Sequence, residues 1–303
     1  MRRMIATLTG ATAAALIAPV LVAAGPANAQ AAPANAQAVQ TDPVSALKKQ
    51  FKPGHGVKLA ENAKIIGEGK NNRSIFSRRN GVLEFGTSGV TASDVTDKFS
   101  LAGAEEELKS LFGPSRTIMV KDTFYTSSGF YADALPEGKK WLRTKGDAIA
   151  PGNPAQKIID PLEPATLKAT LAHTESKRPG GTWDGVRTAV HSGKITLGEL
   201  YKVSPTVRAL LGAKPSAASA TLPVTWKIYL GPDKLVRRAV SSWTQSLRGL
   251  TSLEMTYVND SRYSDWGVKS AIKAPPAAQV ADISELDLGE AQTEDPYIRV
   301  FKD

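Results

Sequence analysis

The chain of 303 residues contains no cysteine. This absence excludes disulfide bonds, zinc–thiolate sites, iron–sulfur clusters and thiol catalysis, and it also excludes an N-terminus anchored through a lipid-modified cysteine. Histidine is almost as scarce, because only His55, His173 and His191 are present, far apart in the sequence. We therefore expect no metal site. The composition, with 42% hydrophobic and 22% charged residues, is otherwise that of a globular protein.

The sequence motifs of common enzyme classes are also missing. No G-x-S-x-G, H-E-x-x-H, Walker or G-x-G-x-x-G sequence is present. Ser45 and Lys48 match the serine–x–x–lysine pair of penicillin-binding enzymes, in which a lysine one helical turn away activates a serine. The companion S-D-N and K-T-G sequences are absent, so chance explains the match better. We expect a binding protein without a cofactor, not an enzyme.

Long apolar runs are lacking as well. The run from Ala11 to Ala24 is interrupted by Pro19 and falls short of the ~20 residues that a membrane-spanning helix needs. It follows two arginines and precedes an Ala-Asn-Ala sequence at 27–29, and this order is typical of a secretory signal peptide. We predict a signal peptide at 1–29.

Cleavage is expected after Ala29, and the repeated Pro-Ala-Asn-Ala-Gln-Ala sequence offers Ala36 as an alternative site. Residues 30–42 then form a flexible leader, since they are rich in Ala, Gln and Pro. The predicted location is outside the cell or in the cell envelope.

Acidic charge is concentrated at the C-terminus. The whole chain carries +9, whereas the tail at 282–303 has seven acidic and two basic residues. The tail therefore contributes −5, Asp42 contributes −1 and the two N-terminal arginines contribute +2. Without these contributions, residues 43–281 carry +13. A body of this charge can bind nucleic acid or rest on an anionic membrane or wall surface. Export argues against nucleic acid, which leaves an anionic surface or a plain solvated exterior.

Alternating apolar and polar residues, typical of half-buried strands, dominate the last third of the chain. Val224, Trp226, Ile228 and Leu230 alternate with polar side chains, and a turn sequence at 231–234 separates them from 235–243. Because hairpin-linked strands are antiparallel, the pattern predicts an antiparallel sheet with one buried face. Further strands are expected at 57–67, 75–85, 117–125, 130–132, 140–144, 182–191 and 252–258, and helices at 42–50, 103–112, 160–176 and from Thr196 and Ser204 onward.

Two segments resemble a known protein family. Residues 222–238 contain a W-x-x-x-x-x-x-D-x-L-x-R-R run, and 263–276 contain Tyr-Ser-Asp-Trp-Gly followed by Ile-Lys-Ala-Pro-Pro. Both are similar to the LolA-like envelope lipoproteins of actinobacteria, including the LppX/LprG type, and the likeness extends more loosely over 57–281. The resemblance implies an α+β fold, in which helices pack over the concave face of a curved antiparallel half-barrel sheet that holds acyl chains. The chain departs from the lipoprotein pattern in having no lipobox cysteine.

These observations predict a secreted protein that binds a lipid or another apolar ligand in the cell envelope. One LolA-like domain at 43–281 would carry this function, followed by an acidic C-terminal tail at 282–303. The alternative is an envelope protein-interaction or sensory module whose core is filled and which takes no ligand. The oligomeric state is left open. The candidate ligand-binding residues are Phe124, Phe130, Val224, Trp226, Ile228, Leu230, Met255 and Tyr257.

Overall fold

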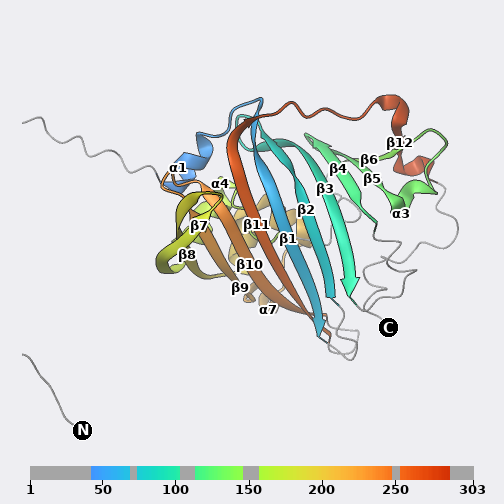
Figure 1. Cartoon of the computed structure of the whole chain (residues 1–303). Coiled ribbons are helices and arrows are strands. Elements are labelled where there is room, and N and C mark those ends of the chain that lie inside the picture. Colours follow the sequence, from blue (N-terminus) through green and yellow to red (C-terminus); the bar gives the residue numbers. More distant parts are fainter. Residues whose placement is uncertain (1–41, 69–73, 103–112, 146–156, 248–252, 287–303) are drawn as a thin grey trace, which may run out of the picture. The chain divides into compact units, whose positions relative to one another are not determined.

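Long strands make up most of the structure, which is a computed structural model that describes residues 42–68, 74–102, 113–145, 157–247 and 253–286 (Figure 1). Twelve strands form one sheet in the order β12-β6-β5-β4-β3-β2-β1-β11-β10-β9-β8-β7. Neighbours are antiparallel except β12 and β6, which run parallel. The strands are β1 His55–Glu68, β2 Ser74–Phe85, β3 Val90–Ala102, β4 Ser115–Val120, β5 Thr123–Ser128, β6 Trp141–Lys145, β7 Thr174–Trp183, β8 Val186–Thr196, β9 Pro223–Leu230, β10 Val236–Leu247, β11 Leu253–Lys269 and β12 Val280–Asp282.

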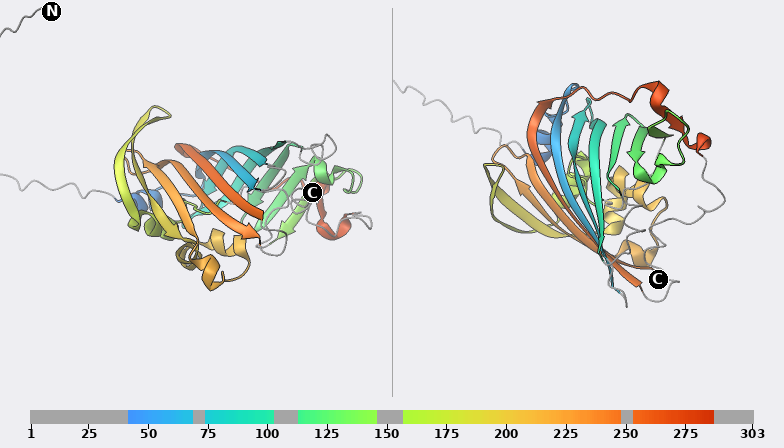
Figure 2. Two further views of the ribbon diagram at one scale, coloured as in Figure 1. Left: turned by 90° about the horizontal axis from the view of Figure 1, so that it is seen from below. Right: turned by 45° about the vertical axis from the view of Figure 1, so that its right-hand side comes forward.

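Short helices pack on one side of this sheet (Figure 2). Leu167, Leu197 and Val207 bring three of them into one apolar core with the inward side chains of β8, β9 and β10. The antiparallel sheet with helices on one face is therefore confirmed, whereas the half-barrel stays a prediction. The helices are α1 Pro43–Lys48, α3 Gly129–Ala132, α4 Pro164–Ala172, α5 Leu197–Val203, α6 Pro205–Leu211 and α7 Ala217–Ala220, with single 3-10 turns η1 Ala277–Gln279 and η2 Ile283–Glu285.

Three helix starts follow their predicted capping sequences. The Asp42 carboxylate accepts hydrogen bonds from the first backbone N–H groups of α1, and Thr196 and Glu199 form a reciprocal capping box at α5. Ser204 caps α6, which ends at Gly212 in the left-handed conformation. The predicted start of the helix at Asp160 is wrong, because α4 begins only at Pro164 after Glu163. Asp160 instead accepts a hydrogen bond from the Leu162 N–H in the preceding turn.

Two predicted elements are wrong for local reasons. The hairpin in 117–132 turns at Lys121, whose φ is 59°, so β5 ends at Ser128 and residues 129–132 form α3 instead of a strand. The predicted helix end at 174–176 is wrong, because these residues begin strand β7, which runs through Pro179 to Trp183. β7 lies at the edge of the sheet, where a proline costs no ladder hydrogen bond. The predicted helix at 103–112 lies outside the described residues.

The sequence prediction also missed strand length. β1 and β2 match their predicted ranges closely, but β3 was not predicted at all, and β11 continues eleven residues beyond the predicted end at 258 to Lys269. Both regions carry polar residues at positions that face the interior, which hides the alternation. β11 pairs with β1 and β10, so residues from both ends of the described chain meet at the centre of the sheet.

Candidate functional site

The sheet register gathers the predicted ligand-binding residues on one face. Ile228 lies opposite Ala239 of β10, Ala239 opposite Ser261 of β11, and Ser261 opposite Glu61 of β1. Since side chains alternate between faces, every second residue from these positions shares the helix-covered inner face. Tracing the register onward across β2, β3 and β4 to β5 places Phe124 on the same face. Phe130 falls in α3, and its side chain lies outside the described residues. The others that share this face are Val224, Trp226, Leu230, Met255 and Tyr257.

The four residues of β9 are packed into the main core. Val224, Trp226, Ile228 and Leu230 are all at least 96% buried, whereas Thr225 and Lys227 between them are exposed. The predicted alternation along β9 is therefore present in the structure. Inward side chains that pack this closely against helices contribute mainly to stability.

The Trp226 ring packs against a glycine on the neighbouring strand. Gly193 of β8 lies opposite Trp226, and a Cβ atom at Gly193 would lie 3.0 Å from the Trp226 ring and 2.0 Å from the carbonyl oxygen of His173. The end of α4 therefore approaches the sheet closely enough that only glycine fits. The Trp226 Nε1 donor is buried and has no hydrogen-bond partner among the described residues.

A second apolar group lies farther along the same face. Tyr257 is half-buried and stacks on Trp243 of β10, with ring centroids 4.7 Å apart and an interplanar angle of 15°. Around it the neighbouring strands contribute buried apolar side chains that are not part of the main core cluster. Phe124 is also half-buried on this face, but β5 lies five places from β11 in the sheet. The buried members of this second apolar group are Ala63, Ile65, Ile75, Leu101 and Met255.

A row of polar side chains that the sequence prediction missed crosses the inner face. Ser261, Glu61, Arg79, Asp97 and Ser115 are successive register partners on β11, β1, β2, β3 and β4. We call these five residues the polar row. Only 1% of Glu61 and 2% of Asp97 is exposed. Each occupies the next inward-facing position after a buried apolar residue, which is Leu59 in β1 and Val95 in β3. Their burial could be predicted from the sequence only if the inward-facing positions of both strands were already known.

Arg79 holds the two carboxylates of the polar row together. Its Nη1 lies 3.2 Å from Glu61 Oε1 and its Nε lies 3.1 Å from Asp97 Oδ1. Burial alone would raise the pKa of Glu61, but the charges of Arg79 and Lys157 and the hydrogen bond donated by Ser261 hold it below its ordinary value. Burial raises the pKa of Asp97 to about 6 in spite of Arg79, and the Glu61 charge adds to this rise. The two carboxylates therefore differ in proton affinity although they share one arginine.

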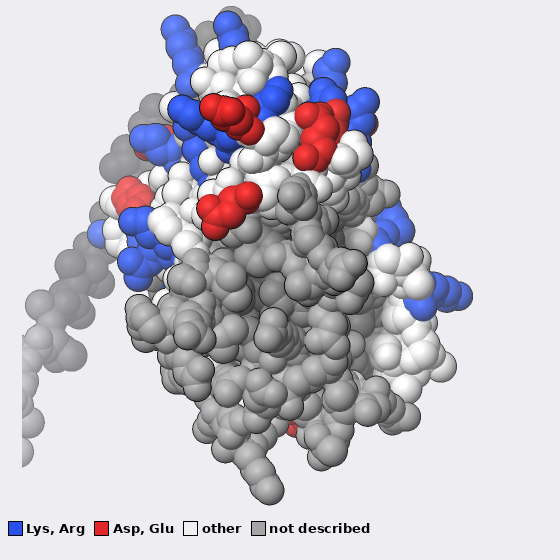
Figure 3. Space-filling view, turned by 90° about the vertical axis from the view of Figure 1, so that its right-hand side faces the viewer, with Lys and Arg blue, Asp and Glu red and all other residues white. Residues whose placement is uncertain are grey.

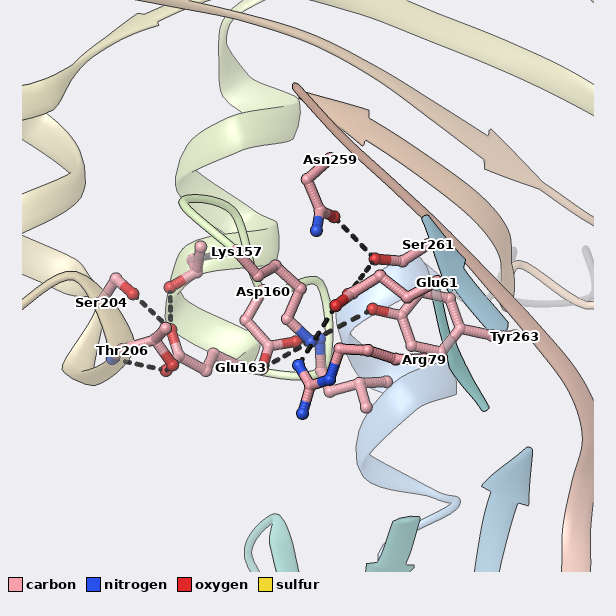
Figure 4. Close-up of polar contacts among 12 residues, drawn as sticks. Glu61, Arg79, Lys157, Asp160, Glu163, Ser204, Thr206, Asn259, Ser261 and Tyr263 are labelled. Atoms are coloured by element: carbon pink, nitrogen blue, oxygen red, sulfur yellow. Dashed lines mark hydrogen bonds and ion pairs between the residues drawn. The ribbon is translucent and has the colours of Figure 1, made fainter. Parts of the chain in front are cut away.

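A second polar cluster connects the polar row to the helices (Figure 4). Lys157 pairs with Asp160 at 3.2 Å and donates to the hydroxyl of the fully buried Tyr263 at 3.4 Å. Burial alone would lower the pKa of Lys157, but Asp160, Tyr263 and Glu61 raise it above its ordinary value. Glu163 accepts hydrogen bonds from the Ser204 hydroxyl and the Thr206 backbone N–H, which joins the start of α4 to the start of α6.

The residues that carry the family resemblance shape the end of this face. Asp233 accepts a hydrogen bond from the Leu235 N–H and pairs with Arg237 at 2.6 Å, which closes the turn between β9 and β10. Trp266 donates from Nε1 to the Val236 carbonyl and stacks on Phe85 with ring centroids 6.0 Å apart. The motif thus fixes a turn and a corner of the core.

The described residues contain no group of three or more His, Cys, Asp or Glu side chains placed to hold a metal ion. No helix within the described ranges has the length and apolar character needed to cross a bilayer. The inner face therefore presents two apolar groups, and the polar row crosses it from β11 to β4.

No family model matches the sequence, and no curated protein matches it either. Three solved structures show a distant likeness. A LolA superfamily protein from Nitrosomonas europaea covers 76% of this chain and 93% of its own, with 7% identity and a TM-score of 0.25. A DUF1329 family protein from Desulfovibrio piger covers 77% and 96%, with 11% identity and a TM-score of 0.26. A porin-like protein from Bacteroides uniformis covers 71% and 97%, with 10% identity and a TM-score of 0.23.

At these TM-scores the likenesses carry no argument about family or function.

Proposed function

We propose that the protein is a secreted binding protein for a lipid or another apolar ligand in the cell envelope, and not an enzyme. The observation that carries this proposal is the second apolar group: its buried members share the inner face with the main core without belonging to it, and the half-buried Tyr257 packs against the core through Trp243. Apolar surface with a few polar side chains at its border is typical of sites that take amphiphilic small molecules. The resemblance to LolA-like proteins of the LppX/LprG type, with a half-barrel sheet, agrees with this role.

The ligand contacts are assigned to the half-buried residues of this face. Tyr257 and Phe124 retain exposed surface, and Met255 lies two residues from Tyr257 on the same strand. The buried β9 residues, with Trp226 among them, then stabilise the fold without contacting the ligand. An acyl chain placed along the second apolar group would have its polar end next to the polar row, where Arg79 keeps 18% of its side chain exposed.

Protein purified from its own host tests the proposal directly. Native mass spectrometry followed by organic extraction should reveal a bound apolar molecule. Titration with a fluorescent fatty acid should then show binding that Tyr257→Ser weakens about tenfold, since most of one aromatic contact is lost. Val258→Ser is the matched control, because Val258 is the next residue of β11 and faces the opposite side of the sheet.

The alternative function, an interaction or sensory module with a filled core, is favoured by the complete burial of Val224 and Ile228. In that case extraction yields no ligand, the fatty acid probe does not bind, and Tyr257→Ser changes only stability. That combination of results would replace the binding proposal with the interaction module.

Secretion is part of the proposal and has its own test. The basic start and the Ala-Asn-Ala sequence at 27–29 support export. N-terminal sequencing of protein from the culture supernatant should find a start after Ala29 or Ala36. An intact Met1, or protein found only in the membrane fraction, would rule the prediction out.

A further inference from the structure

Several arginines that have basic neighbours in the sequence are paired with carboxylates in the structure. Arg143 pairs with Asp282, Arg237 with Asp233 and Arg238 with Asp260. Arg79 is held between the two carboxylates of the polar row. Adjacent basic residues therefore differ in pairing: Arg79 is held by two carboxylates, whereas Arg78 contacts the amide oxygen of Asn62.

The register of three adjacent strands builds a different basic cluster on the outer face of the sheet. Arg78 of β2 lies directly opposite Lys98 of β3, and Lys64 of β1 lies directly opposite Phe76 of β2. The strands β1, β2 and β3 run side by side in Figure 1. We call Lys64, Phe76, Arg78 and Lys98 the outer patch.

Like charges directly across two strands are destabilising, so the outer patch costs the fold free energy. No carboxylate among the described residues forms an ion pair with Lys64, Arg78 or Lys98; the side-chain partner of Arg78 is the amide oxygen of Asn62 at 3.4 Å. Elsewhere on the outer face several acidic side chains pair with arginines, as Asp94 does with Arg116 and Asp260 with Arg238. Figure 3 shows acidic and basic side chains side by side on the described part of another surface.

Phe76 adds an apolar element to this patch. It is 38% exposed and is one of two large apolar side chains that the described residues leave exposed, the other being Ile283. The Lys64 ammonium lies 5.0 Å from its ring centroid. An exposed aromatic ring among cations is suited to the boundary between water and lipid, where the ring enters the headgroup region and the cations meet anionic headgroups.

We infer that the outer patch docks the protein on an anionic lipid surface, with Phe76 at the headgroup boundary and Lys64, Arg78 and Lys98 against lipid phosphates. This inference rests on the proposed envelope location, but it uses the opposite face of the sheet from the ligand site. A soluble anionic polymer would satisfy the cations and would leave Phe76 without a role. The aromatic ring therefore favours lipid over polymer.

Flotation of the secreted protein with vesicles tests the inference. Vesicles containing phosphatidylglycerol should carry the protein at low salt, whereas pure phosphatidylcholine vesicles should not, and added salt should release it. The double variant Arg78→Gln/Lys98→Gln should bind about thirty-fold more weakly, since each basic residue near the surface contributes about a factor of five. Phe76→Ser should weaken binding about tenfold.

Lys194→Gln/Lys227→Gln is the matched control. Both lysines are exposed on the outer face and neighbour each other across β8 and β9, so the variant removes the same charge from the same side. Vesicle binding that falls equally in both double variants would overturn the inference, because net charge alone would then explain it. Unchanged binding of Phe76→Ser, together with equal binding to a soluble polyanion, would also overturn it.

The fatty acid titration separates this inference from the proposed function. The outer-patch variants should take up the probe as the unmodified protein does, since their side chains face away from Tyr257. Loss of vesicle binding with intact probe binding supports the docking surface alone. Loss of probe binding in Tyr257→Ser, with vesicle binding intact, supports the ligand site alone.

Discussion

Glu61 and Asp97 each occupy a position that alternation assigns to an apolar side chain, and each is nearly inaccessible to solvent. A carboxylate in such a position is stable only if it is paired, and Arg79 between them supplies the pair. Ser77 and Ser261 add hydroxyl contacts at 3.5 and 2.6 Å. Arg79 is thus the central member of the polar row, because its removal would leave both buried carboxylates without their shared arginine.

The raised pKa of Asp97 gives a stability profile with a definite sign. The folded protein binds this proton more tightly than the unfolded chain, because the pKa rises from 3.8 to about 6 on folding. The contribution of Asp97 to the free energy of unfolding is therefore fully present below about pH 3 and is lost progressively as the pH rises through about 6, by roughly 3 kcal/mol in total. Asp97→Asn removes this pH dependence. The stability of the variant minus that of the unmodified protein should therefore increase as the pH is raised from about 4.5 to about 7.5.

Urea unfolding at the two pH values measures this difference. Asp94→Asn serves as the control, because Asp94 lies on the opposite face of β3 in an exposed pair with Arg116, where the loss should stay within about 1 kcal/mol. If the stability difference between Asp97→Asn and the unmodified protein is the same at both pH values, the assignment of the titrating group is wrong.

At the scale of single elements, the sequence predicts well where a strand has one apolar and one polar face. β9 is the clearest case, because Val224 to Leu230 alternate without interruption and the burial follows. β3 escaped prediction because Asp97 interrupts its inward apolar phase. β7 escaped because Pro179 and the following glycines resemble a loop, and only the place of β7 at the sheet edge makes a strand possible.

The candidate site shows the same limit more sharply. Alternation placed Trp226 and its neighbours on the inner face, but it could not distinguish a packed core from a ligand surface. The polar row could not be predicted either, since Glu61, Asp97 and Ser261 are brought together by strand register and not by sequence spacing. The outer patch depends on register in the same way.

Gly193 provides a test of how tightly the end of α4 packs against β8. A methyl group at this position would collide with the His173 carbonyl at 2.0 Å, and a backbone atom cannot move aside as a side chain can. Gly193→Ala should therefore destabilise the protein by about 1–3 kcal/mol and change the fluorescence of Trp226. Gly89→Ala is the control, because the methyl group of an alanine there would meet no atom within 4 Å, and its effect should stay within about 0.5 kcal/mol. Equal stabilities of the two variants would show that α4 does not approach the sheet this closely.

Ile228 distinguishes support from contact along β9. It is 0% exposed, so Ile228→Ala should leave a cavity and reduce the free energy of unfolding by about 2–5 kcal/mol. Binding of the fatty acid probe, measured at a temperature where the variant is folded, should change little. A small stability loss with a large loss of probe binding would instead place Ile228 in the ligand site.

At the scale of the whole molecule, the topology ties distant parts of the chain into one sheet. β1, near the start of the described chain, lies between β2 and β11, and β11 joins it to the strands from the last third. The tip of the β7–β8 hairpin reaches back across the outer face, where Asp184 pairs with Arg262 of β11 at 2.7 Å and the Trp183 ring lies 4.2 Å from the Arg238 guanidinium. The edge hairpin β7–β8 is therefore linked by side-chain contacts to β10 and β11 near the centre of the sheet.

The long pairing of β1 with β11 predicts cooperative unfolding. A cut between β6 and β7 would leave two runs of neighbouring strands, β1–β6 and β7–β11, but each run would expose a long unpaired strand at its edge and the first would lose β12. Urea transitions followed by far-UV circular dichroism and by tryptophan fluorescence should therefore coincide. Trp141 of β6 and Trp226 of β9 lie toward opposite ends of the sheet, so fluorescence of single-tryptophan variants reports on each end separately. Two separate midpoints, one for each tryptophan, would show that the ends of the sheet unfold independently and that the pairing of β1 with β11 does not hold them together.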